Sequence, residues 1–208
     1  NNNVIQPYHD NTINGYYCFL TGNNISDDPY YDDVDNGSTI LLSPVYNSIE
    51  YPNIVLSYAY WFSNSYGTSP QEDLFSLDVS NDLGVNWTNI ENINNPTSGW
   101  GHSEILISDY IPILDNLMLR FTVSDLNDTS LVEAAIDDIK IKAFGYPYNF
   151  GDVNFDNNID IIDIVFILGY IQSDFLFNLF QQLLADYNQD NMINVIDIVS
   201  IVDYILEE

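Results

Sequence analysis

Two stretches near the C-terminus carry oxygen-bearing side chains at the spacing of a loop that wraps a cation. Each stretch is twelve residues long, the second begins 34 residues after the first, and the oxygens stand at loop positions 1, 3, 5, 9 and 12. These side chains are Asp152, Asn154, Asp156, Asp160 and Asp163 in loop 1, and Asp186, Asn188, Asp190, Asn194 and Asp197 in loop 2. Carboxylate and amide oxygens in this order are the ligands that calcium prefers. The sequence therefore predicts two calcium-binding loops.

Each loop leads directly into an apolar segment with helical period. The apolar positions are Ile161, Ile164, Val165 and Leu168 after loop 1, and Val195, Ile198, Val199 and Val202 after loop 2. A third helix is predicted over 175–184. Position 6 of each loop, where glycine usually makes the sharp turn, holds Asn157 or Asn191, and asparagine tolerates a left-handed backbone. We expect a small all-α module over 151–208.

This module resembles the type I dockerin, whose two EF-hand-like loop–helix repeats bind cohesin domains; the match covers about 151–206. The resemblance implies that the backbone carbonyls of Asn158 and Met192 complete the two calcium shells. Loop 1 has four carboxylates and loop 2 has three, so we expect tighter binding at loop 1. Loop positions 10 and 11 are the apolar pairs 161–162 and 195–196. Either a cohesin-like or self-association partner contacts them, or they pack within the chain.

Residues 15–143 read as an all-β region. Short β-branched and aromatic runs alternate with Gly, Asn, Pro and Asp clusters, and the predicted strands are 38–43, 53–62, 73–80, 86–92, 101–107, 117–124 and 134–143. This spacing favours an antiparallel jelly-roll β-sandwich. We therefore predict a mainly β chain with a sandwich over 1–145, a short connector over 146–150 and the calcium-binding module over 151–208.

The β-region resembles the MAM- and concanavalin-like jelly-roll domain appended to bacterial secreted zinc carboxypeptidases. The similar segments are 32–44, 79–87 and 119–139. The resemblance implies a non-catalytic domain that follows an enzyme domain, such as a metallopeptidase. It also implies one further calcium ion, bound by Asp33, Asp35 and either Asp137 or Asp138, with Glu133 as a possible ligand. The turn 80–87 is interpreted as a stabilising hairpin with Asp82 at its centre.

The charge balance excludes several classes of partner. The 208 residues include 31 acidic and only 3 basic side chains, which excludes a nucleic-acid binder and disfavours anionic membranes. Cys18 is the single cysteine, so there is no disulfide, and no apolar run is long enough to span a bilayer. We expect an extracellular or cell-surface protein in which bound calcium provides the stability that disulfides often provide.

Nothing in the sequence indicates catalysis. His9 and His102 are the only histidines, and they lack a zinc-type spacing with any acidic residue. The function predicted is attachment or assembly through protein contacts, as the non-catalytic C-terminal region of a secreted bacterial protein. One alternative is a subunit of a calcium-stabilised filament or surface layer. A second is a carbohydrate-binding module that stacks sugar rings on aromatic side chains such as Trp61 and Trp100.

Overall fold

A computed structural model describes residues 5–22, 33–48, 51, 53–67, 69–113, 116–126, 130–144 and 149–207. The chain divides into two compact units, Asn1–Ala143 and Phe144–Glu208. Of the predicted connector 146–150, residues 146–148 lie outside the described residues.

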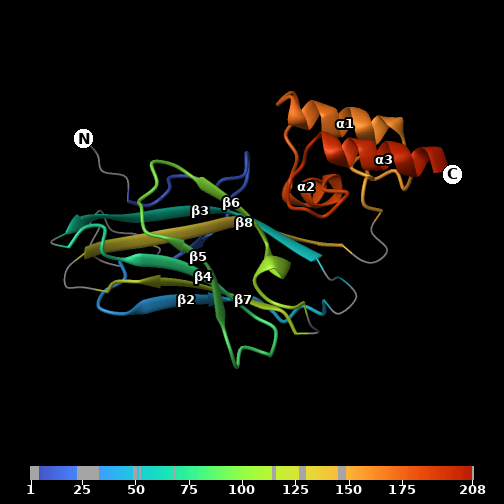
Figure 1. Cartoon of the computed structure of the whole chain (residues 1–208). Helices are drawn as coiled ribbons and strands as arrows, with labels where there is room; N and C mark the ends of the chain where they lie inside the picture. Colours follow the sequence, from blue (N-terminus) through green and yellow to red (C-terminus); the bar gives the residue numbers. More distant parts are fainter. Residues whose placement is uncertain are drawn as a thin grey trace. The chain divides into compact units, whose positions relative to one another are not determined.

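The first unit is a sandwich of two antiparallel four-stranded sheets, which confirms the mainly β prediction at this level. Its strands are β1 (Phe19–Leu20), β2 (Ser38–Leu42), β3 (Asn53–Gly67), β4 (Leu74–Ser80), β5 (Thr88–Ile93), β6 (Gly101–Leu106), β7 (Met118–Ser124) and β8 (Ser130–Phe144), with a 3-10 turn η1 (Ile107–Asp109). One sheet has the order β1-β8-β3-β6 and the other β2-β7-β4-β5 (Figure 1). We call them the β3 sheet and the β4 sheet.

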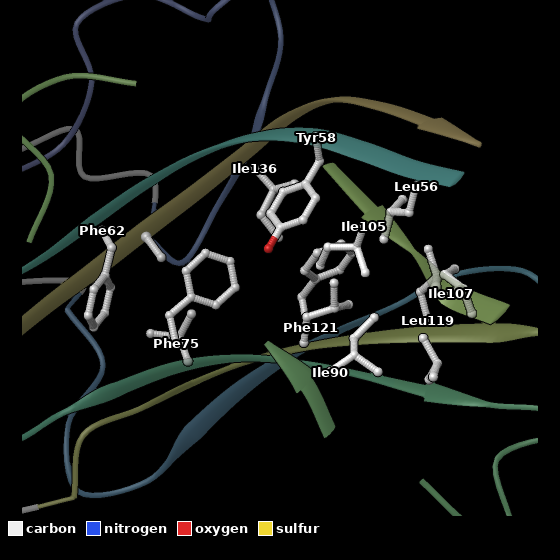
Figure 2. Packing of buried hydrophobic residues seen from close by; sticks show 14 of the residues in the cluster. Leu56, Tyr58, Phe62, Phe75, Ile90, Ile105, Ile107, Leu119, Phe121 and Ile136 are labelled. Atoms are coloured by element: carbon white, nitrogen blue, oxygen red, sulfur yellow. The ribbon is translucent and has the colours of Figure 1, made fainter. Parts of the chain in front are cut away.

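The core lies between the sheets because side chains alternate along each strand. In β7, Leu119, Phe121 and Val123 are buried, and the residues between them are half-exposed. Figure 2 shows side chains of both sheets meeting in this space. Tyr58 of β3 meets the edge of Phe121 with ring centroids 5.1 Å apart, and Phe121 lies 6.3 Å from Phe75 of β4. Tilted and edge-on aromatic pairs of this kind add to the stability gained by burial.

A polar contact joins the two sheets within this apolar space. The Tyr58 hydroxyl donates to the Glu91 carboxylate of β5, and the Ser103 hydroxyl of β6 donates to both Glu91 oxygens at 2.9 and 3.0 Å. Burial, and then the hydrogen bond to Glu91, raise the pKa of Tyr58 far above its usual range. The tyrosine therefore stays neutral and acts as a donor that fixes how the sheets face each other.

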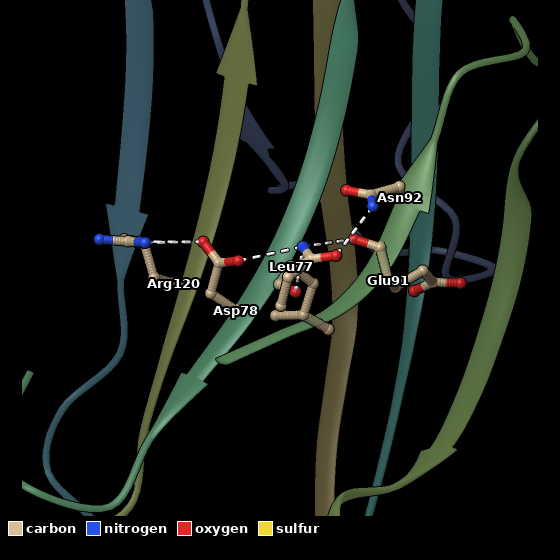
Figure 3. Close-up of polar contacts among 6 residues, drawn as sticks. Leu77, Asp78, Glu91, Asn92 and Arg120 are labelled. Atoms are coloured by element: carbon tan, nitrogen blue, oxygen red, sulfur yellow. Dashed lines mark hydrogen bonds and ion pairs between the residues drawn. The ribbon is translucent and has the colours of Figure 1, made fainter. Parts of the chain in front are cut away.

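The outer side of the β4 sheet is held by a charged network (Figure 3). Arg120 of β7 donates through Nε and Nη2 to one Asp78 oxygen of β4, at 3.0 and 2.9 Å, and its guanidinium lies 4.3 Å from the Trp87 ring centroid. Asn89 donates to the other Asp78 oxygen at 3.0 Å, and Asn92 donates to Asn89 at 2.8 Å. The single arginine of the chain is thus used to order this face.

The turn between β4 and β5 is closed by its own side chains, as the sequence indicates. Asp82 accepts hydrogen bonds from the Asn86 backbone N–H at 2.9 Å and from the Ser80 hydroxyl at 2.8 Å. Gly84 has a φ of +80°, and an added Cβ there would stand 3.0 Å from the Trp87 ring. Glycine is therefore required both by the backbone and by the ring beneath the turn.

Among its described residues, the second unit contains three helices, α1 (Ile161–Ile171), α2 (Leu179–Ala185) and α3 (Val195–Glu207). Its buried apolar residues include Ile164, Ile167, Phe180, Leu184 and Ile201. Of the predicted stripes, Val165, Leu168 and Val199 are exposed instead of buried, as are the pairs 161–162 and 195–196. Within the part of the chain that the structure describes, every helix is too short or too polar to cross a bilayer.

Replacing Phe75 by alanine should lower the free energy of unfolding of the sandwich by about 3–5 kcal/mol, because the ring is fully buried and its loss leaves a cavity. Chemical denaturation followed by tryptophan fluorescence measures this change. Tyr8→Ala is the matched control, since Tyr8 is 74% exposed and should change the midpoint little. Equal effects of the two substitutions would contradict this account of the core.

Candidate functional site

The segment before β1 lies on the outer side of the β3 sheet. The indole N–H of Trp61 donates to the Ile5 carbonyl at 3.0 Å, and that of Trp100 donates to the His9 carbonyl at 3.1 Å. The two indole rings are 6.3 Å apart and nearly perpendicular. Trp61 is only 7% exposed. These tryptophans hold the N-terminal segment in place, so Trp61 does not offer an open face to a sugar ring.

A change of side-chain phase in β8 directs charged residues outward. Val132, Ala134 and Ile136 belong to the core on even positions, whereas Ile139 and Ile141 pack against it on odd positions. Asp138 stands between these two series with a φ of +50°. An extra residue in one strand produces this shift and re-aims the following side chains. As a result Lys140 and Lys142 face away from the core, on the outer side of the β3 sheet.

A cleft of about 300 Å³ opens on this outer side. It is lined by Asn11, Ser57, Tyr58, Ala59, His102, Ser103, Glu104, Asp138 and Lys140. Strand register brings these together, because Ser57 of β3 is paired with Glu104 of β6 and Ala59 with His102. His102 and Glu104 are exposed and alternate with the inward-facing Ser103 and Ile105. The cleft thus presents an imidazole, two carboxylates, an amide and an ammonium group.

Asp138 is the best-anchored side chain of the cleft. One oxygen accepts from the Asn11 amide and the other from the Thr12 hydroxyl, both at 2.8 Å, and Lys140 Nζ lies 3.8 Å away. The hydrogen bonds from Asn11 and then Thr12 lower the pKa of Asp138. The neighbouring Asp137 accepts from the Asn11 backbone N–H at 2.8 Å. Both acids therefore tie the N-terminal segment to β8.

A second cavity of about 350 Å³ adjoins the cleft at Asp138. It is lined by Tyr17, Cys18, Phe19, Asp137, Asp138 and Ile139. Tyr17 is 89% exposed, so aromatic surface lies open beside the charged groups. Phe19 is 57% exposed but is paired with the core-facing Ile136, so it lies on the inner side of the β3 sheet. Burial raises the pKa of the Cys18 thiol, and the charge of Asp137 adds to this effect. The thiol is therefore poorly suited to act as a nucleophile.

The two acidic loops of the second unit share most of their hydrogen bonds. Asp152 at position 1 accepts from the backbone N–H groups of positions 5 and 6 at 3.2 and 3.0 Å, and Asp186 does the same at 3.0 and 2.8 Å. Positions 4 and 6 have positive φ in both loops, at Phe155, Asn157, Gln189 and Asn191. Asparagine at position 6 thus adopts the left-handed backbone expected of it. The similar spacing in the sequence produces two similar backbones.

The last acid of each loop is completely buried. Asp163 accepts from the backbone N–H groups of Val153, Asn154 and Asp160 at 2.9, 3.2 and 3.0 Å. Asp197 is placed alike, with Asn188 and Asn194 as donors at 3.2 and 2.9 Å. Burial raises the pKa of Asp163, against the effect of its hydrogen bonds. Residues 144–208 contain eleven acids and no Lys, Arg or His, so their own side chains supply no counter-charge.

The other predicted calcium ligands have different surroundings. Asp33 is half-buried and Asp35 exposed, on either side of Val34, whose N–H donates to the Val132 carbonyl at 3.1 Å. Asp137 and Asp138 instead contact Asn11 and Thr12. Glu133 is 1% exposed and accepts from the Thr21 hydroxyl. Among the described residues, no group of three or more His, Cys, Asp or Glu side chains is arranged to hold a metal ion.

Sequence reasoning missed the part that the N-terminal segment takes in the cleft. Asn11 and Thr12 precede the first predicted strand, in a polar stretch without periodicity. Their contacts with β8 span 126 residues of sequence. No local sequence pattern indicates a contact between residues so far apart in the chain. The pairing of His102 and Glu104 with β3 was likewise unpredicted, although their alternation within 101–107 places both on one face of a strand.

Comparisons with known proteins found neither a matching family model nor a matching curated protein. Solved structures do match. A family 61 carbohydrate-binding module in complex with β-1,4-galactotriose is 16% identical, with a TM-score of 0.39 over 62% of this chain and 72% of that one. A family 4 module is 10% identical, with a TM-score of 0.33 over 61% and 94%. A cellulose-specific family 28 module is 14% identical, with a TM-score of 0.34 over 63% and 77%.

These comparisons correct the predicted family and the function that rested on it. The type I dockerin resemblance, with its EF-hand-like repeats, is wrong: no dockerin model matches, and the matching structures named above are carbohydrate-binding modules. A helical unit follows the sandwich, but it is not a dockerin module. Attachment, assembly or cell adhesion through a cohesin-like partner is withdrawn with it. The spacing of the acidic loops defined a local loop geometry and not a family.

Replacing Asn11 by alanine should raise the pKa of Asp138 toward its ordinary value, because the largest cause of its lowering is the Asn11 hydrogen bond. A carboxyl titration by NMR of the labelled chain measures this shift. Thr12→Val should have a smaller effect in the same direction. An Asp138 titration unchanged in Asn11→Ala would mean that the segment is not held as described.

Proposed function

We propose that the β-sandwich is a non-catalytic carbohydrate-binding unit whose ligand lies in the cleft on the outer side of the β3 sheet. The observation that carries the proposal is the juxtaposition of the polar cleft with the exposed ring of Tyr17, joined at Asp138. Each cavity is within the size range of a site for a small ligand.

The chemistry of a saccharide fits both parts of this surface. Its hydroxyl groups donate and accept hydrogen bonds, and the cleft offers acceptors at Glu104 and Asp138 and a donor at Lys140. The apolar C–H face of a sugar ring packs on an open aromatic side chain such as that of Tyr17. A neutral saccharide also avoids the repulsion that an anionic ligand meets from a chain of formal charge −28.

Binding is favoured over hydrolysis by the ionisation of Asp138. Glycoside hydrolysis requires a general acid whose pKa is raised, so that it carries a proton near neutral pH. The pKa of Asp138 is instead lowered by Asn11 and Thr12, which keeps this carboxylate ionised. Asp138 is therefore suited to accept hydrogen bonds from hydroxyl groups and not to protonate a leaving group.

A glycan array probed with the labelled full chain should reveal a saccharide ligand, and Glu104→Ala should weaken binding to it about tenfold through loss of a charged acceptor. Isothermal titration with the array's best ligand measures the affinity. Thr88→Ala, an exposed substitution on β5 of the other sheet, is the control and should bind normally. An array without signal, or equal binding by both variants, would contradict the proposed site.

A second function is calcium binding by loops 1 and 2, which we propose from the buried acids and the repeated loop geometry. Asp163 and Asp197 are 0% exposed and lie in a stretch without any basic side chain. A buried carboxylate without a counter-charge is costly, and a divalent cation from solvent would offset that cost. Carboxylate, amide and carbonyl oxygens are the donors that calcium takes. The high calcium levels outside cells agree with the extracellular location that we propose.

Calcium titrations should therefore show that Asp152→Ala removes the tighter of two sites in the second unit and Asp186→Ala the weaker, because loop 1 has one more carboxylate. Isothermal calorimetry resolves the affinities, and the circular dichroism signal at 222 nm should fall on chelation as the helices lose support. Asp174→Asn, exposed and outside both loops, is the charge-matched control. Tighter binding at loop 2 would reverse the proposed order.

A further inference from the structure

Two acids continue the core-facing series of the β4 sheet beyond its last apolar residues. Asp73 immediately precedes β4, in phase with the buried Phe75 and Leu77. Asp125 immediately follows β7, in phase with the buried Phe121 and Val123. The alternation of a strand therefore directs both carboxyl groups into the space between the sheets. Asp73 is 2% exposed and Asp125 is 4% exposed.

Strand register places the two acids opposite each other. Leu74 of β4 is paired with Ser124 of β7, so Asp73 and Asp125 form the next antiparallel pair. Directly opposite residues have Cβ atoms about 4.5–5.5 Å apart, and like charges there are destabilising. The Asp125 N–H continues the ladder by donating to the Gly37 carbonyl beside β2 at 3.0 Å. The pair is thus held by regular strand structure and not by a mobile loop.

Each acid accepts a backbone hydrogen bond on one of its two oxygens. Asp73 accepts from the Leu126 N–H at 3.0 Å on Oδ1, and Asp125 accepts from the Asn36 N–H at 3.0 Å on Oδ2. Asp73 Oδ2 and Asp125 Oδ1 are buried and accept no hydrogen bond in the described part of the chain. Burial, and then the nearby charge of Asp125, raise the pKa of Asp73.

The facing sheet contributes neutral oxygens to the same layer. Asn64 of β3 is 0% exposed, in phase with the core-facing Phe62, and its amide nitrogen donates to the Asp73 carbonyl at 3.3 Å. Its Oδ1 is also buried without a hydrogen-bond donor among the described residues. Ser130 of β8 is 1% exposed and in phase with Val132, and its hydroxyl donates to the Ser69 carbonyl at 2.9 Å. A polar layer therefore closes this end of the core.

The chain has no basic side chain to neutralise this layer. Its only Lys and Arg residues are Arg120, Lys140 and Lys142. Arg120 is paired with Asp78 on the outer side of the β4 sheet, and the two lysines lie on the outer side of β8. Two facing buried carboxylates must then share a proton or bind a cation from solvent.

We propose that Asp73 and Asp125, together with Asn64 Oδ1, bind a calcium ion inside this end of the sandwich. The ligands are all oxygens, which suits a hard cation, and calcium accepts amide oxygens and irregular geometry more readily than magnesium. The described residues include no cluster of three acids. The proposed site therefore has two carboxylates, and neutral oxygens and water supply its other ligands. None of these three residues belongs to the acidic loops or to the saccharide cleft.

The three tryptophans of the chain allow this site to be tested in the full-length protein. Trp61, Trp87 and Trp100 all belong to the first unit, and the second unit has none, so a melt followed by tryptophan fluorescence reports the sandwich. After chelation, calcium at about a hundredfold over its Kd should raise this melting temperature by roughly 5–10 °C. Magnesium at the same concentration should raise it less.

Two isosteric substitutions and one control complete the test. Asp73→Asn and Asp125→Asn should each melt higher than the wild type in chelator, because a like charge is removed, and each should lose most of the calcium response. Asp109→Asn removes an equal charge from an exposed position and should respond to calcium as the wild type does. Circular dichroism establishes whether each variant is folded. If one of the two Asn variants does not fold, the other is sufficient for the test.

The opposite results are equally specific. A tryptophan melt that calcium leaves unchanged, or a calcium response that persists in Asp73→Asn and Asp125→Asn, would overturn the proposal. A shared proton in place of a cation predicts a different pattern. The raised pKa of Asp73 contributes stability that is fully present below the pKa of the unfolded chain and is lost as pH rises through the folded pKa. A wild-type melting temperature that falls in this way with rising pH, and ignores calcium at neutral pH, would therefore also overturn it.

Discussion

Uncompensated negative charge is the constraint on which the arrangement of this protein depends. With 31 acids and 3 basic residues, most carboxylates have to be satisfied by backbone N–H groups, by neutral side chains or by solvent. Asp82, Asp138 and Asp163 each accept several such hydrogen bonds, and in this way each fixes a turn, a terminal segment or a loop. Where hydrogen bonds leave buried oxygens unsatisfied, as at Asp73 and Asp125, the same lack of positive charge favours the binding of a cation from solvent. Acids therefore provide much of the local order that disulfides and ion pairs provide elsewhere.

The sequence was most informative where a residue's surroundings are local. Alternation in 117–123 predicts β7 and its buried face, and the repeated acidic spacing anticipates two loops with left-handed asparagines at Asn157 and Asn191. Both features depend on neighbours within a few residues. The same spacing misled when it was extended to a family, because a loop of oxygen ligands defines what can be bound and not which module surrounds it.

Long-range features were not predictable in the same way. The contacts of Asn11 with Asp137 and Asp138 depend on where the whole β3 sheet places its outer side. One missed feature did leave a trace in the sequence. Asp73 and Asp125 stand in phase with the apolar alternation of their strands, so a strict reading of the period would have assigned both to the core. Acids at core-facing positions are rare, and neither acid was assigned to the core, although Asp73 lies within the predicted strand 73–80.

The shift of phase at Asp138 also bears on how this chain tolerates insertions and deletions. The core-facing residues of β8 have even numbers before Asp138 and odd numbers after it, so this change of register depends on one amino acid. Loss of Asp138 itself would remove the extra residue, and regular alternation would then keep Ile136, Ile139 and Ile141 on the core face and both lysines outside. A one-residue deletion at this point should therefore spare the core face of β8 and remove only the Asp138 contacts that hold Asn11 and Thr12.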